Sequence, residues 1–321
     1  MTNKVLITGG AGFLGKKLAS RLLERGQLNG RAIDKLVLLD MVAPADLHDP
    51  RIETLVGDIA DPALLQRAID RDTRSVFHLA AVVSGAAEAD FDLGMRINLD
   101  ASRHLLERCR ALGHVPRVIF TSSVAAFGGK LPAVIPDDFA TMPMSSYGAQ
   151  KVMGELMVGD YSRKGFIDGR TLRMPTISVR PGKPNAAASS FASGMIREPL
   201  NGEAAVAPVS PETRMWLMSP RLAIENLIHG HDIDAAAIGF PRSISLPGLS
   251  VSVQDMLSAL RTVAGDAVAD RVRWEPDDAI KRIVESWPGA FAATRAKALG
   301  FKADANFADV IRAYLADELG S

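Results

Sequence analysis

The chain opens with a short apolar segment that runs into three regularly spaced glycines, and this feature restricts its fold more than any other. Val5 to Thr8 is apolar and β-favouring, as expected for a buried parallel strand. Gly9, Gly12 and Gly15 follow with the spacing G-x-x-G-x-x-G. Gly9 allows a tight turn, Gly12 lets the backbone approach a ligand, and Gly15 lets a helix lie close to the strand. The pattern predicts a strand, a turn and a helix at the start of a βαβ unit.

The segment after the turn predicts a helix whose N-terminus faces a ligand. Phe13 and Leu14 begin an amphipathic stretch that runs to about Arg25. The free N–H groups and the positive end of such a helix bind phosphates, so we expect a dinucleotide pyrophosphate here. An ordinary turn is the alternative, because a glycine motif alone is weak.

An acidic residue at the end of the next expected strand strengthens the dinucleotide interpretation. Lys35 to Asp40 is apolar until Asp40, which lies slightly beyond the usual spacing because of the polar insert 26–34. An acid there accepts hydrogen bonds from ribose hydroxyls and repels a 2′-phosphate. Met41 stands where an arginine would favour NADP. We therefore expect NAD, although Asp40 could also be a helix N-cap.

Two further strand ends contribute expected cofactor contacts. Ile52 to Val56 reads as a strand, and Asp58 and Ile59 follow it. Asp58 fits two roles equally well: it could reach the adenine, with Ile59 against the ring, or it could cap the helix near Pro62. The strand from Ser75 leads into Leu79, Ala80 and Ala81, where small residues leave room for a cofactor to cross the sheet edge. We expect these last three to contact the cofactor on that ground.

A tyrosine and a lysine in the middle of the chain have the spacing of a catalytic pair. The strand Arg117 to Ser123 ends in hydroxyl groups, and Tyr147 and Lys151 lie four residues apart on an expected helix. A phenol titrates near ~10, and a neighbouring ammonium favours its phenolate. We expect Tyr147 to act as a general base, Lys151 to hold the cofactor ribose, and Ser123 to orient the reacting hydroxyl. A surface Tyr and Lys without function is the alternative.

The motifs together resemble the extended short-chain dehydrogenase/reductase family, which includes NAD-dependent sugar epimerases and dehydratases. The resemblance rests on Thr-Gly-Gly-Ala-Gly-Phe-Leu-Gly, Thr121-Ser-Ser123, Phe127-Gly128 and Tyr147-Gly-Ala-Gln-Lys151. It implies Ser123, Tyr147 and Lys151 as the catalytic triad, with Ser122 as a structural neighbour. It also implies Asn98 as a buried polar anchor near the cofactor.

The stretch that follows the expected sixth strand carries the expected substrate contacts. Pro175, Thr176 and Ile177 should flank the nicotinamide, because ligands lie at the carboxyl ends of such strands. Arg180, Lys183 and Asn185 then suit a small carboxylate, unless the two cations face solvent.

The second half departs from the nucleotide-sugar members of the family. Arg214 matches an arginine that grips a diphosphate in them, but the following Asp is missing. With Arg180 and Lys183, it is a third candidate for binding the substrate carboxylate. The usual Asn-x-Tyr-Gly-Pro-Arg loop is also replaced. Arg180-Pro-Gly-Lys-Pro-Asn and Trp216-Leu-Met-Ser-Pro-Arg resemble instead a bacterial branch that acts on a four-carbon aldonate. In residues 250–321 nothing is assigned to chemistry, and Trp274 and Trp287 are interpreted as packing.

The expected architecture is a doubly wound α/β fold with a parallel sheet. Residues 1–175 should form the dinucleotide-binding domain, with a later return of the chain near 215–245. Residues 176–214 and 246–321 should form a smaller interleaved α/β substrate-binding part. The family resemblance implies that the helices expected over 90–113 and 145–164 pair across a homodimer axis.

Composition excludes several classes of function. The formal net charge is zero, with no basic stripe, which argues against nucleic acid as a partner. A single cysteine, Cys109, fits a reducing compartment, and the early first strand leaves no room for a cleaved signal. No apolar run reaches the ~18 residues of a membrane span, so the cytoplasm is expected. The histidines, including His229 and His231, form no metal-ligand cluster.

The predicted function is NAD-dependent oxidation of the C2 hydroxyl of a small sugar acid to a 2-oxo acid. An epimerase would use the same catalytic residues and is the main alternative. A non-catalytic NAD-binding sensor ranks third, since it would not need Tyr147 and Lys151.

Overall fold

The structure of the chain, a computed structural model, describes residues 2–182 and 187–320. A seven-stranded sheet forms its centre, and all of the strand pairings in it are parallel. In sheet order the strands are β12 (Ser243–Ser245), β8 (Asp168–Met174), β7 (Arg117–Ser123), β6 (Thr73–His78), β1 (Lys4–Thr8), β4 (Lys35–Asp40) and β5 (Ile52–Val56). The order reverses beside β1, as in a doubly wound fold. The predicted fold class is thus confirmed.

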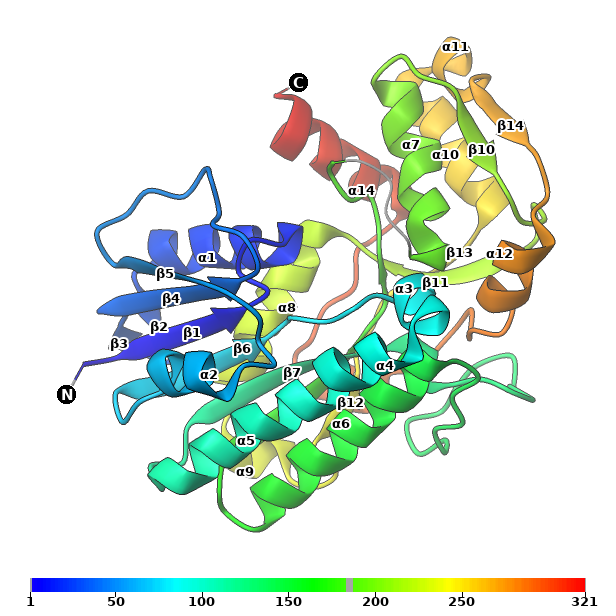
Figure 1. Cartoon of the computed structure of the whole chain (residues 1–321). Helices are drawn as coiled ribbons and strands as arrows, with labels where there is room; N and C mark the ends of the chain where they lie inside the picture. Colours follow the sequence, from blue (N-terminus) through cyan, green and yellow to red (C-terminus); the bar gives the residue numbers. More distant parts are fainter. Residues whose placement is uncertain (1, 183–186, 321) are drawn as a thin grey trace.

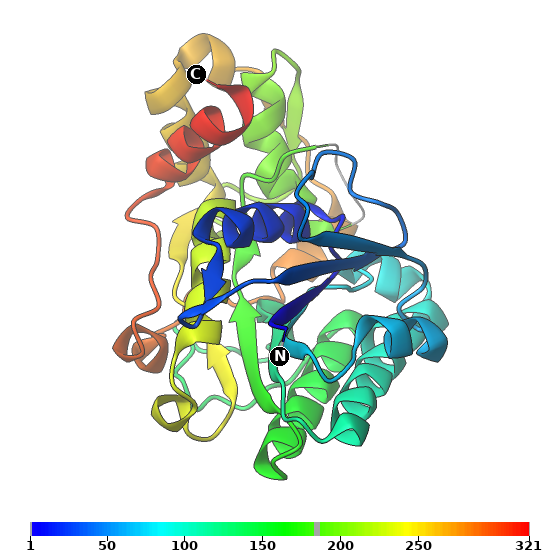
Figure 2. The same ribbon diagram turned by 90° about the vertical axis from the view of Figure 1, so that its left-hand side faces the viewer.

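Helices cover both faces of the sheet (Figures 1 and 2). Val5 and Ile7 point to one face and Leu6 to the other, so that both sides of β1 are buried. The first face packs on α1 (Phe13–Arg25) and α8 (Pro220–Asp232). The second packs on α2 (Pro62–Ala68), α5 (Ala101–Leu112) and α6 (Ser146–Arg163).

Short elements connect these layers. They are the hairpin β2 (Gln27–Leu28) and β3 (Arg31–Ala32), which forms the polar insert, and α3 (Ser84–Ala89), α4 (Phe91–Gly94), a π-helical turn (Met95–Asp100), a 3₁₀ turn (Val124–Ala126), α9 (Ala235–Ile238) and α13 (Thr294–Ala298). The helix expected over 90–113 is therefore one run of α4, the π-helical turn and α5.

A second lobe lies beyond the carboxyl ends of the strands, at the upper right of Figure 1. Its sheets are β13 (Leu249–Ser252)–β11 (Arg214–Met218)–β9 (Thr176–Ile177) and β10 (Ala205–Ala207)–β14 (Val272–Trp274). Its helices are α7 (Phe191–Leu200), α10 (Val253–Ala264), α11 (Asp266–Ala269), α12 (Asp278–Val284) and α14 (Phe307–Tyr314), with a 3₁₀ turn (Ala188–Ser190) and a terminal π turn (Leu315–Leu319). Val179, Met195, Met256, Leu260 and Ile311 form the centre of its core.

The chain passes between the two lobes several times. Within the stretch 215–245, α8 and β12 join the first lobe. Phe291, Ala296 and Phe301 also pack in the first core, although residues 246–321 were expected in the substrate-binding part. A parallel bridge joins Phe291 to Ile135, which lies in the loop before α6 and packs in the same core.

Candidate active site

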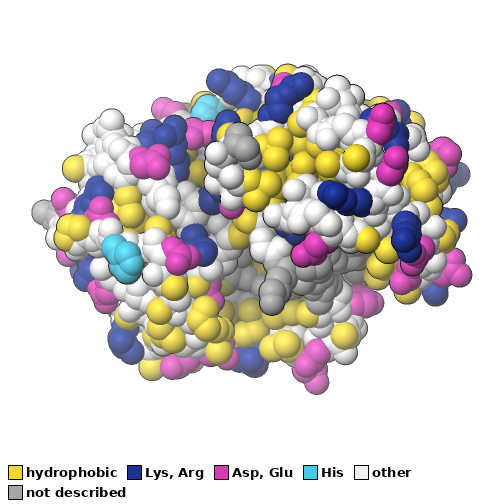
Figure 3. Space-filling view, turned by 90° about the horizontal axis from the view of Figure 1, so that it is seen from above, with side chains coloured by type: hydrophobic (Ala, Val, Ile, Leu, Met, Phe, Trp, Pro, Cys, Tyr) yellow, Lys and Arg dark blue, Asp and Glu magenta, His cyan; other side chains and the backbone are white. Residues whose placement is uncertain are grey.

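A cavity of about 610 Å³ lies where the carboxyl ends of the parallel strands meet the second lobe. Seen from above, the surface is hollowed between the lobes, and positive and negative side chains are interspersed over this face (Figure 3). Most of the residues expected to touch cofactor or substrate line this cavity: Gly9, Gly12, Phe13, Leu14, Gly15, Asp40, Asp58, Ile59, Leu79, Ala80, Ala81, Ser123, Tyr147, Lys151, Pro175, Thr176, Ile177 and Arg180.

The glycine turn has the geometry that its spacing predicts. Gly9 adopts a left-handed φ of +73°. A Cβ at Gly15 would lie 2.1 Å from the carbonyl oxygen of Gly9, so only glycine lets α1 start so close to the strand. At Gly12 the only atom that a Cβ would approach within 4 Å is the Gly9 oxygen, at 3.2 Å. The backbone of this turn is therefore open to a ligand in the cavity.

Asp40 lies at the end of β4 and faces the glycine turn. Its Oδ2 accepts a hydrogen bond from the Ala11 N–H at 2.9 Å, and its Oδ1 accepts one from the Met41 N–H at 2.7 Å. Each carboxylate oxygen keeps a second lone pair for a hydroxyl donor. Asp40 does not serve as a helix cap in the described structure; it lines the cavity.

The sequence left two roles open for Asp58, capping of α2 or contact with the cofactor, and the structure gives the capping role to Asp61. Asp61 caps α2, since its side chain accepts from the Ala63 N–H. Asp58 instead accepts from the Ala60 N–H at 2.8 Å and pairs with Arg96 at the rim of the cavity. The capping alternative for Asp58 is therefore wrong. Asp58 lies in the wall of the cavity, where contact with a cofactor remains a prediction.

Asn98 is 2% exposed and does not line the cavity. Its Oδ1 accepts from the Val82 N–H at 2.8 Å, and its Nδ2 donates to the Val82 carbonyl and to Gln150 Oε1 at 2.7 Å. It therefore anchors the cavity loop at Val82 to α6.

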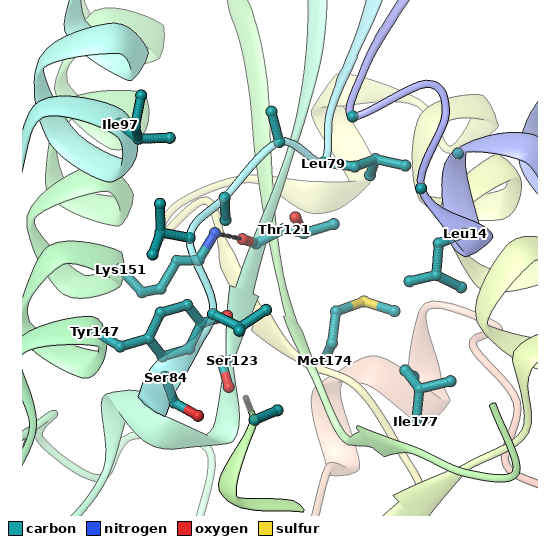
Figure 4. Close-up of a pocket in the computed structure, with 18 of the residues that line it drawn as sticks. Leu14, Leu79, Ser84, Ile97, Thr121, Ser123, Tyr147, Lys151, Met174 and Ile177 are labelled. Atoms are coloured by element: carbon teal, nitrogen blue, oxygen red, sulfur yellow. Dashed lines mark hydrogen bonds between the residues drawn. The ribbon is translucent and has the colours of Figure 1, made fainter. Parts of the chain in front are cut away.

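Tyr147 and Lys151 project from α6 towards the end of β7 (Figure 4). Ser145 caps the helix through the Gly148 N–H, and this sets the start from which both side chains are placed. The Lys151 ammonium donates to the Thr121 carbonyl at 2.8 Å and lies 5.6 Å from the centre of the Tyr147 ring. Ser123 and Tyr147 lie together at the wall of the cavity.

Burial governs the titration of this pair. Burial raises the pKa of Tyr147 to about 12, while the Ser123 hydroxyl and the Arg180 charge act to lower it. Burial lowers the pKa of Lys151 to about 8, and the negative charge of Glu155 opposes this. Without further positive charge the phenol keeps its proton at neutral pH, so a positively charged ring in the cavity would favour the phenolate.

Arg180 is the cation that the structure brings to the catalytic pair. Its backbone is held by α7: its N–H donates to Ser193 Oγ at 3.0 Å, and its carbonyl accepts from Arg197 at 2.8 Å. Burial and the nearby Arg197 charge lower the pKa of its guanidinium, which nonetheless stays charged. Lys183 and Asn185, the other expected carboxylate contacts, lie outside the described residues.

Arg214 is not part of this site. It begins β11 with an exposed side chain that donates to the carbonyl and hydroxyl oxygens of Ser250. The cavity lining does not include it. The structure thus does not bring Arg214, a candidate contact to the substrate carboxylate, to the cavity, because β11 pairs with β13 and holds its first residue at the surface.

Trp287 is a cavity residue that sequence reasoning missed. It was interpreted as packing, and it does pack partly against the second core, but it also lines the cavity beside Ser189. Trp274, interpreted in the same way, is 36% exposed on β14. Both tryptophans lie far along the chain from Tyr147, so no local sequence pattern could have shown that Trp287 lines the cavity and Trp274 does not.

The residues present fit a dinucleotide. The three glycines line the cavity, and a Cβ at Gly12 would approach only the Gly9 oxygen, so the turn leaves its backbone open to a pyrophosphate there. Asp40 offers acceptors for a ribose, and Lys151 offers a buried donor at the far end of the same cavity. Among the described residues no group of three or more His, Cys, Asp or Glu could hold a metal ion.

Comparison with known proteins places the chain in a family. Residues 5–217 match the model of the NAD dependent epimerase/dehydratase family. The chain belongs to this family, and NAD is its cofactor.

Individual relatives are similar over their whole length. The chain is 63% identical over 317 residues to D-erythronate dehydrogenase of Cupriavidus necator, covering 98% of each chain. It is 48% identical over 313 residues to D-erythronate dehydrogenase of Haemophilus influenzae, covering 97% of this chain and 98% of that one. A crystal structure from Agrobacterium tumefaciens, named a nucleoside-diphosphate-sugar epimerase, superposes with a TM-score of 0.94 at 45% identity, covering 99% of this chain and 95% of that one.

Proposed function

We propose that this chain is an NAD-dependent dehydrogenase that oxidises the C2 hydroxyl of D-erythronate to give 2-oxo-D-erythronate. The observation that carries the proposal is the meeting of Ser123, Tyr147 and Arg180 in one cavity with the dinucleotide cradle. A hydroxyl-binding pair beside a fixed guanidinium suits a 2-hydroxy acid. The 63% identity to a D-erythronate dehydrogenase supports the four-carbon substrate.

The chain's own residues supply recognition and proton transfer. Arg180 binds the substrate carboxylate through charge-assisted hydrogen bonds, which places C2 near the hydroxyl-bearing side chains. Ser123 and Tyr147 hold the C2 hydroxyl, and Tyr147 takes its proton as the carbonyl forms. Lys151 keeps positive charge next to the phenol. When bound, the oxidised nicotinamide accepts the hydride from C2 and adds the positive charge that favours the phenolate.

Asp40 supports the choice of NAD over NADP. Both of its oxygens are held by backbone N–H groups at the mouth of the glycine turn, so the carboxylate cannot easily swing away. A 2′-phosphate would meet this fixed negative charge, whereas ribose hydroxyls can donate to it.

A homodimer and a cytoplasmic location complete the proposal, with a role in carbohydrate-acid catabolism. Phe91 and Leu156, on α4 and α6, are 57% and 69% exposed, which supports a partner on this face. Cys109 is buried, and burial raises the pKa of its thiol to about 12, so it suits a reducing compartment without being reactive. Light scattering of the purified protein would test the dimer.

The testing experiment measures NADH formation by purified protein with NAD and a panel of C4 to C6 aldonates and uronates. Rapid turnover of D-erythronate, with little when NADP replaces NAD, is expected. Absence of NADH with every acid would overturn the proposal. Nucleotide sugars would then be assayed for an epimerised product without net cofactor change, as an epimerase requires.

A further inference from the structure

The helical run that follows β6 lines the cavity with one of its faces. Leu93, Arg96 and Ile97 all belong to the cavity lining, and they stand at positions i, i+3 and i+4 of this run. Arg96 and Ile97 lie in its π-helical turn, a kind of turn that is frequent at functional sites. Asn98, in the same turn, is fixed to the cavity loop at Val82. The backbone that carries Arg96 is therefore held firmly beside the cavity.

Arg96 forms an ion pair with a carboxylate from another stretch of the cavity wall. Its Nη1 donates to Asp58 Oδ2, while Asp58 Oδ1 accepts from the Ala60 N–H at 2.8 Å. Asp58 follows β5, so the pair joins the stretch after β5 to the stretch after β6. Each stretch also brings an apolar side chain to the cavity, Ile59 in the first and Ile97 in the second. Apolar surface with a few fixed polar groups suits a planar base.

The guanidinium of Arg96 still has unused binding capacity. An arginine carries several N–H donors, and among the described residues the Asp58 carboxylate is its only hydrogen-bond partner. No aromatic ring of the described residues covers its planar face. The side chains of Arg96 and Asp58 are 49% and 32% exposed. An ion pair this exposed contributes little to folding, so stability does not account for it.

The distribution of charge in the cavity also sets Arg96 apart. Among the described residues of the lining, the cations are Arg96, Lys151 and Arg180. Lys151 and Arg180 lie at the catalytic end. Arg96 is therefore the only described cation that lines the other end, where Asp40 and Asp58 carry negative charge.

The order of the strands places an adenine beside this ion pair. Tyr147 and Lys151 mark the nicotinamide end near β7, and Asp40 at the end of β4 offers acceptors for the adenosine ribose. In the sheet, β5 is the neighbour of β4 on the side away from β7. A dinucleotide that lies in this direction has its adenine near the end of β5, where Asp58 and Arg96 meet.

We propose that Arg96 is a cofactor-binding residue whose guanidinium stacks on the adenine of NAD, held in position by Asp58. A guanidinium is planar and weakly hydrated, so it stacks readily on aromatic faces, and every base has such a face. The inference takes from the family assignment only that NAD is the cofactor, and it is independent of the substrate proposed above.

Binding of adenosine compounds tests the inference without any substrate. NADH binding is followed by its fluorescence, and NAD, ADP-ribose and adenosine are measured by displacement of NADH. We expect Arg96→Met to weaken all of them alike by about tenfold, as for loss of one side chain that stacks on a base. Adenosine carries no phosphate, so a loss confined to NAD and ADP-ribose would assign Arg96 to the phosphates and overturn the inference. Unchanged affinity for all of them would overturn it as well.

Two further arginine variants separate stacking from charge. Arg96→Lys keeps the charge without the plane, so it should recover at most about threefold of the lost affinity. Arg103→Met removes the same charge nearby, because Arg103 lies in the adjoining surface groove with Asp58 and outside the cavity lining. It should leave every dissociation constant unchanged. Full recovery in Arg96→Lys, or a tenfold loss in Arg103→Met, would show that charge alone acts and would contradict stacking.

An Asp58→Asn background shows whether Arg96 binds adenine itself or only neutralises Asp58. The asparagine can still accept a hydrogen bond from Arg96, while the negative charge is gone. Adding Arg96→Met in this background should again weaken adenosine binding, by about threefold or more. If it has no effect there, the loss in the single variant came from the bared carboxylate, and the inference is overturned.

Thermal unfolding of each variant provides the control for folding. Because the ion pair is so exposed, the unfolding temperatures should stay close to that of the parent. Since no acid substrate is used, a failure to oxidise D-erythronate would count against the proposed function alone.

Discussion

The Asp40 carboxylate binds the backbone N–H of Ala11 at 2.9 Å and so joins the end of β4 to the glycine turn of β1. This contact fixes a negative charge beside the glycine turn, in the wall of the cofactor cavity. Replacing Asp40 with Asn keeps an acceptor for one backbone N–H and removes the charge. We expect the ratio of kcat/KM for NADP to that for NAD to rise about tenfold or more, since like-charge repulsion costs several kcal/mol. Initial rates with both cofactors test this, and an unchanged ratio would argue against Asp40 as the discriminating residue.

Tyr147→Phe should remove the base while leaving the cavity almost unchanged. Turnover should fall by about 10²–10⁴-fold, the usual contribution of a positioned acid or base. NAD affinity, measured by calorimetry, should stay within a few-fold of the parent. Near-normal turnover would show that another group takes the proton.

Arg180 and Arg214 form a matched pair, one in the cavity and the other exposed on β11. Arg180→Met should raise the KM for D-erythronate by about 10–100-fold, as expected for loss of a hydrogen-bonded charge. Arg214→Met should leave it unchanged. Steady-state kinetics on both variants decide between them, and the reverse outcome would restore Arg214 as the carboxylate site.

Trp287 and Trp274 allow a second comparison of this kind. Trp287 lines the cavity from the second lobe, whereas Trp274 is partly exposed on β14. Trp287→Ala should enlarge the substrate end and raise the C6-to-C4 activity ratio by about tenfold, within the range that pocket size supplies. Trp274→Ala should leave the ratio as it is. If both variants keep the parent ratio, the tryptophan does not limit substrate length.

Gly15 tests the close approach of α1 to the sheet, and Gly159 in α6 serves as the control glycine. Gly15→Ala would press a methyl group against the Gly9 carbonyl and should abolish NAD binding or prevent folding. A methyl group at Gly159, in α6, would meet no atom within 4 Å, so Gly159→Ala should stabilise the protein by about 0.5–1 kcal/mol. Calorimetric titration with NAD measures binding by the Gly15→Ala variant, and thermal unfolding measures the stability of the Gly159→Ala variant. A Gly15→Ala variant that binds NAD normally would contradict the close packing.

The first half of the site was predictable because its signals are local. The glycine spacing, the acid at the end of β4 and the four-residue step from Tyr147 to Lys151 each lie within a single turn, strand or helix. Their positions around one cavity follow from the rule that parallel strands present their carboxyl ends at one edge.

The remaining residues depend on how distant segments meet. Trp287 reaches the cavity only because α12 packs beside the turn at Ala188–Ser190, and Arg214 is kept away from it by the pairing of β11 with β13. Glu155 lies four residues after Lys151 on α6, but its ion pair with Arg173 could not be predicted, because β8 brings Arg173 from outside the helix. No short pattern contains these relationships.

The interleaving of the two cores has a consequence for how this protein can be divided. Its second core combines residues from 179–217, 249–287 and 307–315, while α8, β12 and Phe291 between them belong to the first. No single cut in the chain therefore yields two pieces that each keep a whole core. A truncated half would expose the apolar face of the sheet where α8 lies, so the two lobes can only be made together in one chain.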